Sequence, residues 1–167
     1  APHAPFPRGY WYNQDMFQKA GISKVPGTWE EWFFACEKLK SMDDSVVPVI
    51  LDANHIAYLM TALLANEDST ELENIRGSRT NTNTQAFDKM LEQLKRISYY
   101  AVLAGNYNYR DTLASFNKKE SAIYINGVWA NSMIDESLDV SYAAFPSDDG
   151  KGIATRSACV GYILGNT

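Results

Sequence analysis

The stretch that most constrains the fold is residues 116–129, FNKKESAIYINGVW, where a short apolar run stops at a glycine. Its isoleucine and tyrosine side chains predict a strand over residues 121–126, which Gly127 ends. Trp129 follows near the expected start of a helix over residues 127–135. Open α/β sheets bind their ligands outside the carboxyl ends of the strands. The stretch therefore predicts an α/β domain with a small-molecule site beside Gly127 and Trp129.

The clearest helix signal lies over residues 29–41. Thr28 and Glu31 have the T-x-x-E spacing of a capping box, in which each side chain bonds a backbone N–H of the first turn. The apolar residues that follow share the three- and four-residue spacing of one helix face: Trp29, Trp32, Phe33, Cys36 and Leu39. We therefore predict that a helix begins at Trp29.

Strand and helix signals alternate along the rest of the chain. We expect a strand at residues 10–12, and further strands over residues 46–51, 140–145 and 158–164. We expect helices over residues 14–20, 54–65, 85–103 and 111–116, with an irregular surface segment over residues 67–83. The expected apolar face of the helix over residues 85–103 comprises Phe87, Leu91, Leu94, Ile97 and Ala101. Alternation with helices in excess predicts an α/β layer architecture.

Composition and charge exclude several classes of protein. The 167 residues, 46% hydrophobic and 21% charged, are typical of one globular domain. The net charge is −5 and no basic run occurs, so we expect no nucleic-acid partner. The longest nearly apolar run, residues 56–65, is far shorter than the roughly 20 residues of a membrane span. Cys36 and Cys159 are expected to be buried thiols rather than a disulfide.

Signatures of catalysis are scarce. The sequence has no nucleophile elbow, zinc-protease motif or phosphate-binding glycine loop. The only histidines are His3 and His55, and a histidine near a helix start is commonly solvated or capped. The carboxylate pairs at residues 43–44 and 148–149 lie in turns, where aspartate bonds its own backbone. We therefore expect no enzyme, no metal and no cofactor.

Each of three aromatic features has two interpretations. The adjacent Tyr99 and Tyr100 could ligate a ferric ion, but neighbouring helical residues point about 100° apart, which favours one tyrosine in the core and one at its edge. The loop over residues 105–111, GNYNYRD, mixes amides and aromatics, as carbohydrate contacts and ordinary loops both do. Trp129 either presents a flat face to a sugar ring at the strand end or packs beneath the helix.

Two blocks of sequence carry a resemblance to a known family. The first is YWYNQDMFQKAGI at residues 10–22 followed by PGTWEEWFFACEKLK at residues 26–40. The second is SFNKKESAIYINGVW at residues 115–129 followed by AAFPSDDG at residues 143–150. Their order and spacing resemble those of bacterial extracellular solute-binding proteins of family 1. These are the carbohydrate-binding subunits of ABC importers, related to maltose-binding protein.

The resemblance implies a receptor of two lobes. Such proteins are non-catalytic, extracellular or periplasmic, free or lipid-anchored, and close on a mono- or oligosaccharide before delivering it to a membrane permease. The implied fold is a helix-rich lobe of the type II periplasmic-binding-protein class with a small mixed sheet. The chain resembles most of the C-terminal lobe. Residues 10–157 then form the lobe, residues 1–9 an extended tail or linker, and residues 158–167 a returning crossover strand.

The resemblance also implies binding residues. The family's stacking tryptophan matches Trp129, beside Gly127, and Tyr58 is the nearest match to a second aromatic. His55 and Asn54 are expected as polar neighbours. Glu120 stands where the family has glycine, a change expected to alter the turn rather than the site. The alternatives are a lobe that binds a non-sugar ligand such as ferric ion, and a small carbohydrate-active enzyme that uses turn carboxylates.

Overall fold

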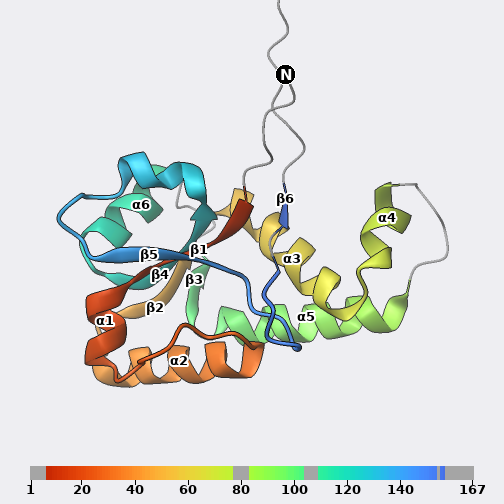
Figure 1. The fold of residues 1–167 in the computed structure, drawn as a ribbon, viewed down its shortest axis with the longest axis horizontal. Helices are drawn as coiled ribbons and strands as arrows, with labels where there is room; N and C mark the ends of the chain where they lie inside the picture. The colour runs from red at the N-terminus through yellow and green to blue at the C-terminus, as the bar shows by residue number, and fades with distance from the viewer. Residues whose placement is uncertain (1–6, 77–82, 104–108, 154, 157–167) are drawn as a thin grey trace, which may run out of the picture.

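The computed structural model describes residues 7–76, 83–103, 109–153 and 155–156. A six-stranded mixed sheet lies at its centre and carries helices on both faces (Figure 1). The strands are β1 (Pro7–Asn13), β2 (Val47–Leu51), β3 (Ala101–Leu103), β4 (Ser121–Gly127), β5 (Val140–Ala144) and β6 (Thr155–Arg156). The helices are α1 (Gln14–Lys19), α2 (Trp29–Met42), α3 (Ala53–Glu67), α4 (Thr70–Arg76), α5 (Thr84–Ser98), α6 (Tyr109–Asn117) and the 3-10 helix η1 (Val128–Met133). This architecture confirms the expected α/β class.

The strand order brings distant segments to one edge of the sheet. The order is β3-β2-β4-β1-β5, with β6 paired to β1. Strands β2, β3 and β4 are parallel, whereas β1 is antiparallel to β4 and places Arg8 opposite Gly127. The carboxyl ends of β2 and β4 therefore lie beside the amino end of β1. Residues 7–9, which the sequence assigned to a tail, belong to this strand.

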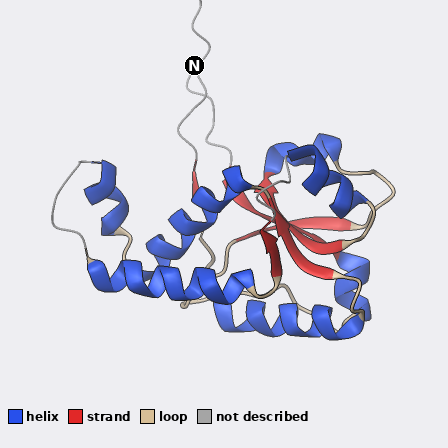
Figure 2. Ribbon diagram, turned by 180° about the vertical axis from the view of Figure 1, so that it is seen from behind, coloured by secondary structure: helices blue, strands red, loops and turns tan. Residues whose placement is uncertain are grey.

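Alternating side chains of the strands build a core on each face of the sheet. Tyr10 and Ile123 join the larger core, where α2 contributes Trp29, Trp32 and Phe33. Trp11 and Tyr124 point to the opposite face and pack with residues of α6 and η1. Because both faces are covered, every residue of β4 is buried. Figure 2 shows the red strands enclosed by blue helices.

Local signals placed α1 and α2 correctly. Asn13 caps α1, as its Oδ1 accepts from the backbone N–H of Met16 at 3.0 Å. At α2, the Thr28 hydroxyl accepts from the N–H of Glu31, whose carboxylate accepts from Gly27 and Thr28 in return. The predicted capping box is confirmed, and so is the burial of Cys36. Cys159 lies outside the described residues.

The segment at residues 67–83 was wrongly expected to be irregular throughout. It contains α4, which together with α3 and α5 extends away from the sheet (Figure 1). Asp68, the residue that ends α3, accepts from the N–H and the hydroxyl of Thr70, the first residue of α4. Leu72 then packs against the larger core, so this short polar segment gains a tertiary contact that its local sequence does not announce.

The expected helix over residues 85–103 was also wrong over its last residues, 99–103. Helix α5 ends at Ser98, and residues 101–103 form β3, which pairs in parallel with β2. The buried face contains Ala86, Met90 and Ile97, whereas Leu91 is 52% exposed. A three-residue strand at a sheet edge depends on its neighbour rather than on its own sequence.

The remaining elements differ less from expectation. The segment after Gly127 is a 3-10 helix, shorter than the expected helix over residues 127–135. The strand expected over residues 158–164 lies outside the described residues, whereas β6 at residues 155–156 was not expected. Within the described part of the chain, no helix is both long and apolar enough to cross a membrane.

Candidate functional site

Aromatic and polar side chains gather where β2 and β4 end and β1 begins. Arg8 comes from β1, His55 and Tyr58 come from α3, and Trp129 comes from η1. The ring centroid of His55 lies 5.4 Å from that of Tyr58 and 6.4 Å from that of Trp129. We call these four side chains, together with Tyr109 of α6, the strand-end cluster. Side chains from several elements therefore do come together at the sheet edge that the sequence predicted.

Trp129 lies directly on Gly127. A Cβ atom placed on Gly127 would come within 2.0 Å of the six-membered ring of Trp129. The backbone of Gly127 is extended, so the glycine is needed for this close approach rather than for an unusual conformation. The carbonyl oxygen of Gly127 accepts from the indole Nε1 of Trp11 at 3.0 Å. The two-residue spacing from glycine to tryptophan thus fixes the half-buried Trp129 ring at the end of β4.

His55 is held by the residue that caps its own helix. Asp52 directly follows β2, and its Oδ1 accepts from the backbone N–H groups of Asn54 and His55. Its Oδ2 lies 2.8 Å from Nδ1 of His55, and both side chains are buried. A carboxylate only accepts, so Nδ1 is the donor in this contact. The Asp52 cap therefore fixes the orientation of the His55 ring.

Arg8 covers one face of Tyr58. Its guanidinium carbon lies 3.1 Å from the centre of the Tyr58 ring and 5.5 Å from that of Trp129. A guanidinium stacked on an aromatic face is attracted by the ring electrons, and its N–H groups point outward in the guanidinium plane, where they can meet other partners. Tyr58 thus supports a cation rather than offering this face directly to a ligand.

Polar groups of β4 and α6 lie beneath Trp129. Asn126 Nδ2 donates to the Tyr124 hydroxyl, and Asn126 Oδ1 accepts from the N–H of Gly127 at 2.7 Å. Burial raises the pKa of Tyr109, and hydrogen bonds with Tyr124 and Asn126 oppose that rise. Burial likewise raises the pKa of Tyr124, so both phenols keep their protons at neutral pH. Tyr124 and Asn126 are fully buried, so the hydroxyl next to the flat aromatic surface is that of the half-buried Tyr109, which also contacts Sδ of Met133 at 3.6 Å.

The structure brings most of the expected residues together. Trp129, Gly127, Tyr58 and His55 meet in the strand-end cluster, and His55 is buried rather than solvated. Asn54 is exposed at the start of α3, where its backbone N–H bonds Asp52. The structure shows where these residues lie, and a binding role for each of them stays a prediction.

Sequence reasoning missed Arg8, Asp52 and Tyr109. Asp52 could have been found, because an aspartate between a strand and a helix is a capping signal. Tyr109 lies in the loop over residues 105–111, which was singled out, but residues 105–108 lie outside the described residues. Arg8 has no local signal, since only the antiparallel pairing of β1 with β4 sets it opposite Gly127.

The alternative sites have local structural explanations. Tyr99 and Tyr100 pack ring edge to ring face at 5.0 Å between centroids, and Tyr100 donates to Glu37. Asp43 accepts from both the N–H and the hydroxyl of Ser45. Asp149 accepts from Ser147 and Lys151, which holds its pKa well below the usual range. Among the described residues, no three histidine, cysteine, aspartate or glutamate side chains gather to hold a metal.

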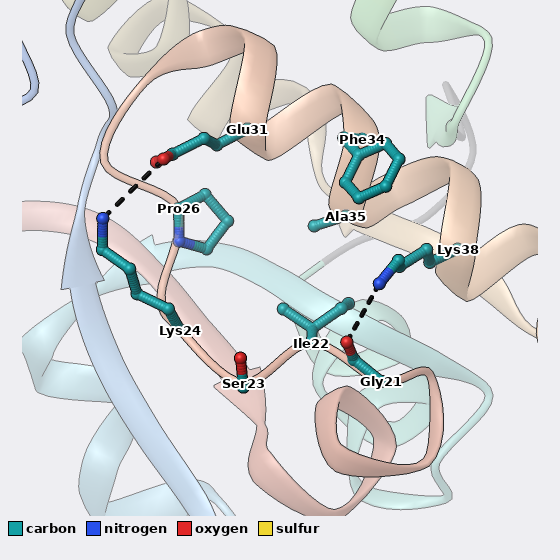
Figure 3. A pocket seen from close by; sticks show the side chains of 9 residues that line it. All are labelled: Gly21, Ile22, Ser23, Lys24, Pro26, Glu31, Phe34, Ala35 and Lys38. Carbon is teal, nitrogen blue, oxygen red and sulfur yellow. Dashed lines mark hydrogen bonds and ion pairs between the residues drawn. The ribbon is translucent and has the colours of Figure 1, made fainter.

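A shallow pocket of about 180 Å³ lies elsewhere, between α2 and the loop that follows α1. Figure 3 shows its lining, with the Lys24–Glu31 ion pair on one side and Lys38 donating to the Gly21 carbonyl on the other. Phe34 at its rim is 64% exposed. The pocket is beside the end of β1 that is remote from Arg8, so it is separate from the strand-end cluster.

The chain is similar to known proteins. A family model described as bacterial extracellular solute-binding protein matches residues 2–165. The multiple sugar-binding protein of Streptococcus mutans is 28% identical over 163 residues, which cover 87% of this chain and 38% of that protein. The chain spans 34–38% of the length of the curated relatives that it matches.

Solved structures share the fold. A family 1 extracellular solute-binding protein from Bifidobacterium longum subsp. infantis has a TM-score of 0.75 at 21% identity, with 95% of this chain and 46% of that chain covered. A chitin oligosaccharide binding protein has a TM-score of 0.71 at 27% identity, with 87% of this chain and 39% of that chain covered.

Proposed function

Because this chain belongs to the family of bacterial extracellular solute-binding proteins, whose model matches residues 2–165, we propose that it is the carbohydrate-binding lobe of an ABC-importer receptor. The family places the protein outside the cytoplasm, in the extracellular or periplasmic space. The lobe is of the type II class, with a helix-rich body and a small mixed sheet.

The observation that carries the proposal is the position of Trp129. Its ring is fixed on Gly127 at the end of β4, with the His55 imidazole 6.4 Å away. A sugar ring has an apolar C–H face and a polar edge, so it needs a flat aromatic surface next to hydrogen-bonding groups. Trp129 supplies the surface, and His55 with Tyr109 supplies the polar groups. The names of relatives that bind multiple sugars and chitin oligosaccharides support the same ligand class.

The strand-end cluster forms one wall of the binding site. The chain spans 46% or less of the length of the proteins compared, so the opposite wall is contributed by a second lobe of a two-lobed protein. The lobes close by a hinge motion, and the ligand favours the closed state because only that state touches both walls. The closed receptor then delivers the sugar to its membrane permease.

The test is calorimetric titration of the two-lobed protein with a panel of mono- and oligosaccharides, ferric citrate and peptides. We expect heat of binding from at least one saccharide, and recovery of that saccharide unchanged after prolonged incubation. Hydrolysed product would instead favour a carbohydrate-active enzyme. Heat from ferric citrate or peptides, with none from any saccharide, would overturn the carbohydrate proposal.

A further inference from the structure

The strand-end cluster contains a cation that a neutral sugar does not require. Arg8 lies at the start of β1, opposite Gly127, and its guanidinium stacks on Tyr58 within 5.5 Å of the Trp129 ring. Its Nε is buried and has no hydrogen-bond partner among the residues that the structure describes. A buried donor without a partner costs about 1–3 kcal/mol, so the described residues do not satisfy the hydrogen-bonding capacity of this guanidinium.

A second arginine of the same chain shows how such a side chain is normally satisfied. Arg96 also stacks on an aromatic face, with its guanidinium carbon 3.8 Å from the centre of the Phe33 ring. It donates two hydrogen bonds to the carboxylate of Glu30, at 2.5 and 2.9 Å. Arg8 has the same stacking, but the ion pairs within the described part of the chain do not include it.

Neighbouring acidic groups do not neutralise Arg8. Asp52, the carboxylate that holds His55, accepts from His55 Nδ1 and from two backbone N–H groups at the start of α3. Burial raises the pKa of Tyr142, and the positive charge of Arg8 opposes that rise without producing an anion at neutral pH. The guanidinium fork is therefore available for an external anion.

We propose that Arg8 recognises a carboxylate on the bound carbohydrate, so that the receptor selects acidic sugars such as uronic-acid oligosaccharides over neutral ones. This inference rests on the proposed carbohydrate-binding function. A carboxylate matches the planar fork with two parallel hydrogen bonds, as Glu30 matches Arg96. The protein has a net charge of −5, so long-range attraction does not favour anions and the preference comes from this contact.

The test compares ligands that differ in charge alone. The two-lobed protein is titrated with oligogalacturonate, with its methyl ester, with a sulfated oligosaccharide and with neutral oligosaccharides. We expect the acid to bind about tenfold to a hundredfold more tightly than its ester, since hydrogen bonds to charged groups are worth that much. The preference should shrink as salt is raised.

Variants assign the preference to one side chain. Arg8→Met removes the charge and retains a long apolar stem over Tyr58, so it should abolish the preference for the acid over its ester. Arg8→Lys keeps the charge without the fork and should retain only part of the preference. Arg96→Met, which removes the other stacked arginine, should leave the preference intact.

The outcomes separate the two proposals. Equal affinity for acid and ester, or an acid preference that survives in Arg8→Met, would overturn the role of Arg8 while carbohydrate binding stands. Tighter binding of the sulfated ligand alone would replace the carboxylate by a sulfate and overturn the inference as stated. Failure of every saccharide, neutral and acidic, would overturn the proposed function itself.

Discussion

At the scale of single residues, the site depends on contacts that fix aromatic rings. The Trp129 ring occupies the space where a side chain at position 127 would begin, and Asp52 holds the imidazole of His55 at 2.8 Å. Neither ring is free to reorient without breaking a buried contact. A binding surface fixed before the ligand arrives loses less conformational entropy on binding.

Replacing Gly127 by alanine should move Trp129. The added Cβ would overlap the ring at 2.0 Å, so the ring must leave its place above the end of β4. We expect a cost of about 1–3 kcal/mol in the free energy of unfolding, typical of overpacking, and weaker saccharide binding. Urea denaturation and calorimetry measure the two effects.

A matched glycine provides the control for that substitution. A Cβ atom on Gly27 would meet nothing closer than 3.4 Å, so Gly27→Ala should leave saccharide affinity unchanged. If Gly127→Ala binds saccharides as tightly as Gly27→Ala does, the contact between Gly127 and Trp129 is not part of the binding site.

The same residues show how far the sequence alone could predict the site. Gly127 and Trp129 could be predicted because the end of a strand is a local signal with a known consequence in α/β sheets. Arg8 could not be predicted, since its place depends on the pairing of two strands more than a hundred residues apart. The residues next to Arg8 in the sequence therefore carry no signal that β1 pairs with β4.

At the scale of elements, α2 begins with a charge-dependent cap. The carboxylate of Glu31 accepts from the N–H groups of Gly27 and Thr28, and these bonds, with Lys24 nearby, lower its pKa below the ordinary 4.5. A group whose pKa is lowered by folding stabilises the protein above its unfolded pKa and loses that contribution as pH falls through its folded pKa.

The substitution Glu31→Gln should therefore change stability in a pH-dependent way. At pH 7 the variant should unfold at a lower temperature than the original protein. Below pH 4.5 the difference should shrink, because Glu31 itself becomes protonated as the pH passes its lowered pKa. Thermal unfolding across this pH range measures the difference. Glu92→Gln, at an exposed position of α5, is the control, and an equal, pH-independent loss in both variants would contradict the role of the cap.

Elements with local signals could be predicted, whereas elements that need a partner could not. Helix α2 has both its capping box and its apolar stripe within one stretch of sequence. Strand β3 has three residues whose side chains suit a helix equally well, and its pairing with β2 decides the outcome. The same dependence on a packing partner explains why α4 was not predicted, because Leu72 contacts a core built by distant residues.

At the scale of the whole molecule, the sheet order gathers the site from separate parts of the chain. Arg8, His55 and Trp129 come from segments that meet only because β4 lies between β1 and β2. The lobe therefore has to be folded before the strand-end cluster exists.

The central claim, that Trp129 is the surface on which the sugar stacks, is tested most directly by calorimetric titration of Trp129→Ala in the two-lobed protein. The saccharide that binds the original protein should bind the variant about tenfold to a hundredfold more weakly, since the apolar burial on the ring is lost. Phe34→Ala removes an exposed aromatic beside the remote pocket and should leave the affinity unchanged. Unchanged affinity in Trp129→Ala, or an equal loss in Phe34→Ala, would contradict the account.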